Sequence, residues 1–309
     1  MFKAFTCTTH GVPGLLPDDL LRLFRSFSDI GARVLVHCEE EFITKDNEER
    51  LRAALREDYG VIPEWRSPEA ELVAVNTVAL LARLTGTNIT VAHASQPSVI
   101  DLVSRERELN ASLCVESCPQ YFYLDSEEVR KHGPTRKFTP PARDAPAGEL
   151  MWERLARGEI DVISTDHAPS TLDQKFGSDI WDCPFGLPGV ETTLTMLLNA
   201  VNEDRLTLER LVDVYSTTPA RLLGLYPRKG AIRVGSDADV VLVDVDEEHT
   251  LRNEDIVSKA GWTPFEGYRL KGRPVLTMLR GEVVAKDGKL VAEAGTGSFI
   301  TREATKHFL

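Results

Sequence analysis

Four residues that could bind a metal ion lie in, or directly after, short apolar runs of the kind that form buried strands. They are Lys3 near the N-terminus, His37 after residues 32–36, His93 after residues 88–92, and Asp166 at the end of residues 160–166. A β/α barrel gathers the C-terminal ends of its strands at one rim, where residues of several strands build an active site. Imidazole and carboxylate groups are common ligands of zinc. The pattern therefore predicts a metal-dependent hydrolase.

Each of these residues also has a structural interpretation when it is taken alone. A lysine such as Lys3 is typically solvated at the surface, and a single histidine is more often structural than a ligand. Asp166 could cap a turn that begins near Pro169. Two histidines at strand ends, together with the run STDHAP, favour metal-binding and catalytic roles over structural ones. We expect His167 to support the site and His10 to be either a loop residue or a substrate contact.

The composition limits the possible partners. The chain has 309 residues, 42% of them hydrophobic, which is enough for a substantial core. A net charge of -12 and a pI near 5.2 argue against binding to nucleic acid or to an anionic membrane. No run approaches 18 apolar residues, and the N-terminus has no basic segment followed by a long apolar one, so neither membrane spanning nor secretion is expected. A small-molecule substrate and a cytoplasmic location are therefore expected.

The five cysteines agree with a reducing compartment. Their number is odd and their spacing is wide, which favours free thiols over a disulfide framework. Cys114 and Cys118, with Glu116 between them, could be read as a zinc site, but their place in an apolar strand favours core thiols.

Strand-like and helix-like segments alternate through most of the chain. A helix is expected from Pro17 to Gly31, and a second one from its cap Ser67 to Gly86. Further helices are expected near residues 96–109, 147–157, 191–202 and 207–215 and from 219 to about 224, with strands at 112–118 and 160–166. For the second helix, the expected buried face comprises Ala70, Val73, Ala74, Thr77, Leu80, Leu81 and Leu84. This order predicts an α/β fold with parallel strands.

After Tyr226 the pattern changes to short alternating strands with glycine turns, which predicts a small β-rich domain and a loosely ordered tail from Ala294. We therefore predict a barrel part over residues 1–225 and a β-sandwich portion with a tail over residues 226–309.

Seven segments together resemble the cyclic amidohydrolases, which include dihydroorotases, hydantoinases or dihydropyrimidinases, and allantoinases. They are VHCEE at 36–40, VAHAS at 91–95, ESCPQYF at 116–122, FTPPAR at 138–143, STDHAP at 164–169, PFGLPGVET at 184–192 and GSDADVVLVD at 235–244. The resemblance covers nearly the whole chain in the same order. It implies a TIM-like (β/α) barrel with a small C-terminal β-sandwich, and typically a dimer or tetramer.

The resemblance also implies roles for particular residues. Lys3 resembles a carboxylated lysine that bridges two divalent cations, usually zinc, and His37 and His93 resemble ligands of the second cation. Asp166 resembles a ligand of the first cation that is also the general base. The segments resembling the ring-binding loops point to substrate contacts at Thr139, Phe185 and Gly186. The implied reaction is hydrolysis of a small cyclic amide.

Two departures from the family pattern lead to further expectations. No His-x-His pair occurs in the 309 residues, and roughly five of the eight β/α units of a barrel are present. We expect an upstream segment to be missing, exposed barrel edges to promote aggregation or dimerisation, and this polypeptide alone to have little or no turnover. The alternative is a non-catalytic, dihydropyrimidinase-like protein that acts through protein association. Dihydroorotate, hydantoin and allantoin all remain possible substrates, because Phe185 and Ser170 each depart from a pattern of one subgroup.

Overall fold

The computed structural model describes residues 1–9 and 11–301 and contains two compact units. The first unit is Met1–Glu191 together with Arg252–Glu266, and the second is Thr192–Leu251 together with the chain from Gly267 on. The second unit thus includes helices that the sequence places in the barrel part. A domain boundary near residue 226 stays a prediction.

The first unit is built on one parallel sheet of five strands in the order β1-β2-β3-β4-β5. The strands are β1 (Phe2–Phe5), β2 (Arg33–His37), β3 (Asn88–Val91), β4 (Leu113–Ser117) and β5 (Val162–Ile163). Residues such as Val34, Val36, Ile89 and Val115 are completely buried, as expected of parallel strands that are covered on both faces. The strand expected at 160–166 is shorter than predicted, because only two of its residues pair with β4.

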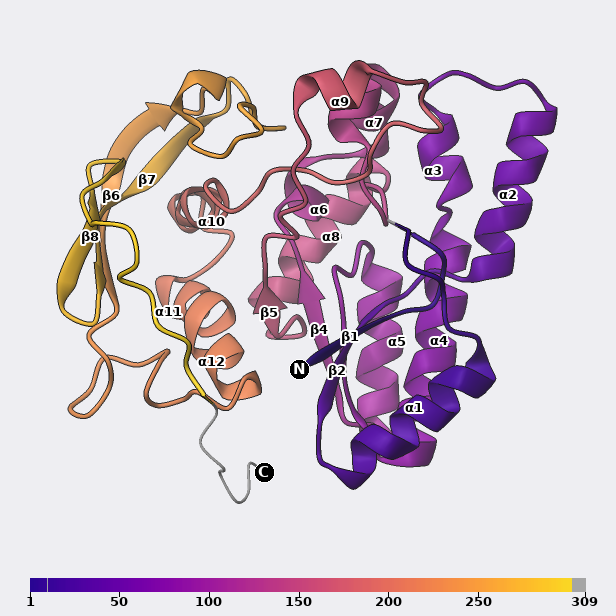
Figure 1. Cartoon of the computed structure of the whole chain (residues 1–309), viewed down its shortest axis with the longest axis horizontal. Coiled ribbons are helices and arrows are strands. Elements are labelled where there is room, and N and C mark those ends of the chain that lie inside the picture. Colours follow the sequence, from indigo (N-terminus) through magenta and orange to yellow (C-terminus); the bar gives the residue numbers. More distant parts are fainter. Residues whose placement is uncertain (10, 302–309) are drawn as a thin grey trace. The chain divides into compact units, whose positions relative to one another are not determined.

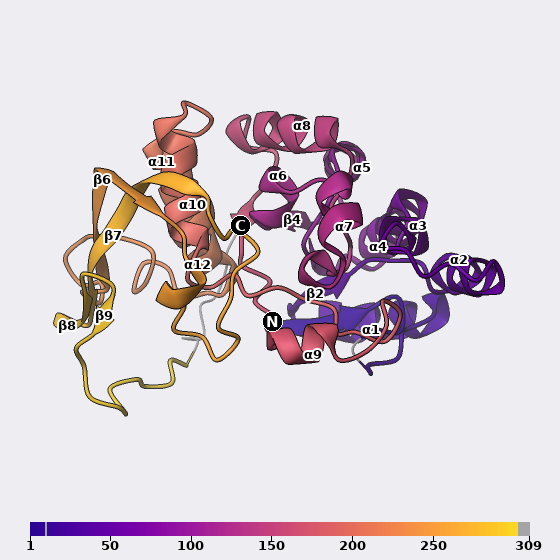
Figure 2. The same cartoon turned by 90° about the horizontal axis from the view of Figure 1, so that it is seen from above.

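Most helices of this unit connect successive strands of the sheet. The helices are α1 (Pro17–Asp29), α2 (Glu41–Ala53), α3 (Val61–Trp65), α4 (Pro68–Thr85), α5 (Pro97–Glu108), α6 (Gln120–Tyr123), α7 (Ser126–His132), α8 (Ala145–Ala156) and α9 (Leu172–Phe176), with the 3-10 helices η1 (Gly133–Arg136) and η3 (Asn253–Asp255). Figures 1 and 2 show α1, α4, α5 and α8 side by side as one helical layer of this unit. This alternation confirms the predicted α/β fold with parallel strands.

Helix α4 begins and ends where the sequence predicts. The Ser67 side chain accepts a hydrogen bond from the Ala70 N–H at its N-terminus. Gly86 has a φ of 71° at its C-terminus, a left-handed conformation that costs glycine little. The two ends of this helix are therefore set by local residues.

The expected buried face of α4 is partly wrong. Val73, Leu80 and Leu84 are exposed, whereas the buried residues are Ala70, Glu71, Ala74, Val75, Val78, Ala79 and Ala82. The helix is apolar on more than one side, so periodicity alone does not fix which side faces the sheet. The small alanines lie inward, and this face also brings the carboxylate of Glu71 into the interior.

The second unit combines three helices with an antiparallel sheet. Its helices are α10 (Thr193–Asn202), α11 (Leu208–Val212) and α12 (Thr218–Leu222), with the π-helical turn η2 (Asp213–Thr217) between the last two. The sheet contains β6 (Val240–Thr250), β7 (Arg269–Leu279), β8 (Glu282–Lys286) and β9 (Lys289–Leu290) in that order. The β-rich C-terminal part is therefore confirmed. The expected tail from Ala294 lies partly outside the described residues.

Among the described residues, no helix is both long enough and apolar enough to span a membrane.

Candidate functional site

The predicted ligands His37, His93 and Asp166 lie at or just beyond the C-terminal ends of three parallel strands. His37 is the last residue of β2, His93 follows the end of β3 by two residues, and Asp166 follows β5 by three. His93 and Asp166 have φ angles of 37° and 43°. Such angles are uncommon for residues other than glycine and are found preferentially at functional sites. The strand ends therefore carry strained backbone at two of the predicted positions.

The structure brings His37 and His93 into direct contact. His37 Nδ1 lies 2.9 Å from His93 Nε2, and the ring centroids are 4.7 Å apart at an angle of 68°. Both side chains are buried, with 2% and 3% of their surface exposed. Two ring nitrogens from adjacent strands thus face each other in the interior.

Glu39, two residues after His37, is a fully buried carboxylate beside this pair. Its Oε2 atom accepts hydrogen bonds from His37 Nε2 at 2.8 Å and from Thr139 Oγ1 at 2.6 Å, and it lies 3.4 Å from Nη1 of Arg66. Burial acts to raise the pKa of Glu39, but the Arg66 charge and the hydrogen bonds from His37 and Thr139 outweigh it and lower the pKa to about 2. Glu39 is therefore an ionised acceptor.

Cys7, His37 and Glu39 place three possible ligand atoms close together, but their surroundings disfavour a cation among them. Nη1 of Arg66 lies 3.3 Å from Cys7 Sγ and 3.4 Å from Glu39 Oε2, so a positive charge already neutralises the carboxylate. Burial and the Glu39 charge raise the pKa of Cys7 to about 12, so a cation that bound Cys7 as a thiolate would have to displace a firmly held proton. We therefore interpret Glu39 as a partner of His37 and not as a ligand.

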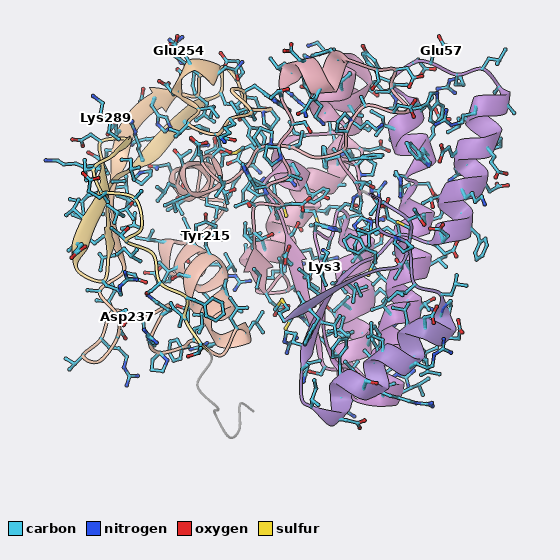
Figure 3. The ribbon with its side chains drawn as sticks, viewed as in Figure 1. Lys3, Glu57, Tyr215, Asp237, Glu254 and Lys289 are labelled. Carbon is cyan, nitrogen blue, oxygen red and sulfur yellow. The ribbon has the colours of Figure 1, made fainter. Side chains whose placement is uncertain are left out.

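Lys3 lies on β1, the edge strand beside β2 (Figure 3). Its Nζ is 5.5 Å from the centroid of the Phe5 ring, which in turn lies 5.6 Å from the His37 ring. Because alternate residues of a strand share a face, Lys3 and Phe5 point to the same side of the sheet. Lys3 is thus on the face that carries His37.

Glu116 on β4 interacts with three of the predicted site residues, Lys3, His93 and Asp166. Its Oε1 accepts a hydrogen bond from Ser164 Oγ at 2.6 Å, and the backbone N–H of His93 also donates to its carboxylate. Burial raises the pKa of Glu116, the hydrogen bond from Ser164 and the charge of Lys3 lower it, and the charge of Asp166 raises it. The charges of Lys3 and Asp166 therefore both act on the half-buried Glu116 carboxylate, which accepts a hydrogen bond from the His93 backbone.

The three predicted substrate contacts have defined structural partners. Thr139 donates to Glu39, and the Phe185 ring lies 5.3 Å from the Trp65 ring. Gly186 has a φ of 109°, and a Cβ atom there would lie 2.3 Å from the carbonyl oxygen of Ala168, so only glycine fits. A role of Thr139, Phe185 and Gly186 in substrate binding stays a prediction.

The structure also shows the surroundings of His167 and of the cysteines Cys114 and Cys118. Nδ1 of His167 accepts hydrogen bonds from the N–H groups of Gly189 and Val190 at 3.1 and 3.2 Å, as expected of a residue that supports the loop after β5. Cys118 is buried and Cys114 is half-buried, and both are free thiols; a purely structural role for them stays a prediction. His10 lies outside the described residues.

Sequence reasoning did not single out Glu39, Arg66 or a link between Thr139 and Glu39. The segment VHCEE contained a signal, because an acidic residue two positions after a candidate ligand can reach its second ring nitrogen. Arg66 and Thr139 carried no such local signal, since they lie 27 and 100 residues from Glu39 in the sequence.

We expect Glu39 to make the zinc-free protein sensitive to acid. Its pKa is about 2 in the folded chain, below the ordinary 4.5, so its stabilising contribution is complete above pH 4.5 and is lost as the pH falls toward 2. This contribution is about 3 kcal/mol. Urea unfolding between pH 2 and 6 should therefore show a weaker pH dependence for Glu39→Gln than for the wild type. Glu127→Gln, at an exposed side chain, should behave as the wild type, and equal slopes for all three proteins would contradict the expectation.

A histidine pair and an aspartate at or beyond the C-terminal ends of parallel strands, with a lysine within β1, are the arrangement expected of a metal-dependent barrel hydrolase. The chain belongs to the amidohydrolase family, which it matches over residues 1–284. This confirms the predicted family and fold class.

The relatives of the chain include several cyclic amidohydrolases. It is 35% identical to the L-hydantoinase of Paenarthrobacter aurescens over 305 residues, which cover 96% of this chain and 67% of that protein. It is 40% identical to the dihydroorotase of Halobacterium salinarum over 232 residues, or 75% of this chain and 53% of that protein. The solved structure of L-hydantoinase (dihydropyrimidinase) from Arthrobacter aurescens superposes with a TM-score of 0.94 at 33% identity, covering 97% of this chain and 68% of that one.

These comparisons confirm cyclic amide hydrolysis as the reaction class of the family branch and give no support to the non-catalytic alternative. The chain spans about two thirds of the length of the hydantoinases and about half of the dihydroorotase.

Proposed function

We propose that this chain binds a divalent cation, zinc, through His37, His93 and a carboxylated Lys3, and that it hydrolyses a small cyclic amide with Asp166 as general base. The observation that supports this proposal most is the 2.9 Å separation of His37 Nδ1 and His93 Nε2. Zinc binds histidine nitrogens at about 2.0–2.1 Å, so two nitrogens this close can reach one ion. Their burial and the Glu39 contact on the other nitrogen of His37 also fit ligation.

A bound divalent cation supplies a Lewis acid that polarises a carbonyl and lowers the pKa of water. The protein side of the reaction needs a base, and Asp166 at the end of β5 has the chemistry for it. Asp166 removes a proton from the attacking water as its oxygen bonds to the ring carbonyl carbon. When the C–N bond breaks, the proton passes to the leaving amide nitrogen. Thr139, Phe185 and Gly186 are proposed to orient the ring.

The cation capacity of the 309 residues is limited. Lys3, His37 and His93 suffice for one cation, whereas a second would have only the carboxylated lysine and Asp166, too few ligands for a firm site. We therefore expect slow turnover. A cytoplasmic location is supported by five cysteines that are all free, and the family resemblance supports a homo-oligomer.

Elemental analysis and hydrolysis assays test the proposal together. The purified chain, supplied with zinc and bicarbonate, should contain about one zinc per chain and open at least one ring among dihydroorotate, hydantoin and allantoin. Asp166→Ala should lower the rate by roughly 100-fold to 10,000-fold, while Asp173→Ala, at an exposed position of α9, should leave it unchanged. A chain without zinc would overturn the proposed site, and zinc without measurable opening of any of the three rings would overturn the proposed hydrolysis by these 309 residues.

A further inference from the structure

Three side chains from separate segments contact the same oxygen of the Glu39 carboxylate. His37 Nε2 contacts Oε2 at 2.8 Å, Thr139 Oγ1 contacts the same oxygen at 2.6 Å, and Nη1 of Arg66 lies 3.4 Å from it. Glu39 is fully buried, and the other three side chains are at most 5% exposed. These contacts are buried, and hydrogen bonds to a charged group are strong and geometrically demanding in the protein interior.

The contact with Glu39 fixes which nitrogen of His37 carries the proton. Thr139 Oγ1 and Arg66 Nη1 both donate to Oε2, so this oxygen is an acceptor toward His37 Nε2 as well, and a His37 ring with a single proton carries it on Nε2. The lone pair is then on Nδ1, the atom that lies 2.9 Å from His93 Nε2. Glu39 therefore presents His37 in the tautomer that can donate an electron pair toward His93.

The backbone around Glu39 is fixed as well. Thr6 Oγ1, directly after β1, lies 3.0 and 2.7 Å from the carbonyl oxygens of His37 and Glu39, which share its one proton, and it accepts from the Glu39 N–H at 2.9 Å. Thr139 reaches Glu39 from the segment FTPPAR, and Arg66 reaches it from the residue after α3. Carboxylate, ring and main chain thus have little freedom to move independently.

We infer that Glu39 is a positioning residue for the cation site and that Thr139 and Arg66 support it, so that the FTPPAR segment acts on the cation through Thr139, Glu39 and His37 in sequence. This inference rests on the proposed function, because it assigns His37 Nδ1 to the cation. It also changes the expected role of Thr139, whose hydroxyl donates to Glu39 and serves the ligand His37.

Two measurements on the full chain test the inference. The first is the tautomer of His37 in the zinc-free protein by ¹⁵N NMR, with its signals assigned from His37→Gln. The wild type should carry the proton on Nε2, and Glu39→Ala should show a mixture of tautomers. The second is the zinc dissociation constant by competition with a chromophoric chelator. Glu39→Ala should weaken zinc binding roughly 10-fold to 100-fold, as is usual for the partner of a ligating histidine.

Substitutions at threonines provide a milder variant and its controls. Thr139→Val removes only the hydroxyl and keeps Glu39, so it remains informative if Glu39→Ala does not fold, and it should weaken zinc binding roughly threefold to tenfold. Thr139→Ser keeps the hydroxyl and should restore wild-type affinity. Thr90→Val removes a buried hydroxyl on β3 that has no hydrogen-bond partner among the described residues, and it should change neither measurement.

The outcomes separate this inference from the proposed function. A proton on Nδ1 of His37 in the wild type would overturn the inference, as would zinc affinities of folded Glu39→Ala and Thr139→Val within twofold of the wild type. If the wild type binds no zinc, the proposed function fails, while the tautomer of His37 still decides whether Glu39 positions the ring.

Discussion

His37→Ala and His93→Ala should each abolish stoichiometric zinc binding, with the affinity lowered by more than about 100-fold. The two side chains supply an imidazole pair whose facing ring nitrogens lie 2.9 Å apart. Loss of a partner of a ligating histidine already costs about 10-fold to 100-fold, and loss of the ligand itself costs more. Alanine at either position leaves the cation with one histidine ligand and with Lys3, which binds only after it has been carboxylated.

Isothermal titration with zinc in bicarbonate buffer measures this effect. His132→Ala is the matched control. His132 is the last residue of α7, its side chain is partly exposed, and its Nε2 lies 3.3 Å from Glu128 Oε2 on the same helix. The control should bind zinc like the wild type. Unchanged zinc binding by His37→Ala or His93→Ala would show that the cation is held elsewhere.

Glu71→Ala should destabilise the first unit by about 3–5 kcal/mol, the usual cost of removing one partner of a buried ion pair. Glu71 and Arg143 are 1% and 8% exposed, and Arg143 Nη2 lies 2.9 Å from Glu71 Oε2. Arg143 also donates to Ser95 Oγ at 2.8 Å and to the Arg66 carbonyl at 2.7 Å, and Gln96 donates to Glu71 at 2.9 Å. Without Glu71, the guanidinium would remain buried without its counter-charge.

Urea unfolding followed by tryptophan fluorescence reports on this effect, since Trp65, Trp152, Trp181 and Trp262 all belong to the first unit. The double variant Glu71→Met with Arg143→Met should lose less stability than the sum of the two single variants, because it leaves no unpaired buried charge. Glu127→Ala removes an exposed ion pair of α7 and should cost less than about 1 kcal/mol. A similar small cost for Glu71→Ala would contradict the buried network.

The sequence by itself determined the order of the elements and the positions of the predicted ligands. Strands buried on both faces are short continuous apolar runs, and α4 is delimited by Ser67 and Gly86, whose effects are local. Since strand ends meet at one edge of a parallel sheet, Lys3, His37, His93 and Asp166 could be chosen without coordinates.

Only the tertiary structure decided which side of α4 is buried and which residues meet at His37. The helix has apolar residues on several sides, so packing against the sheet selects Ala74, Val78 and Ala82 over Leu80 and Leu84. Arg66 and Thr139 reach Glu39 across 27 and 100 residues of sequence. Such contacts depend on how distant segments pack in the interior, and periodicity and capping, which act over a few residues, carry no information about them.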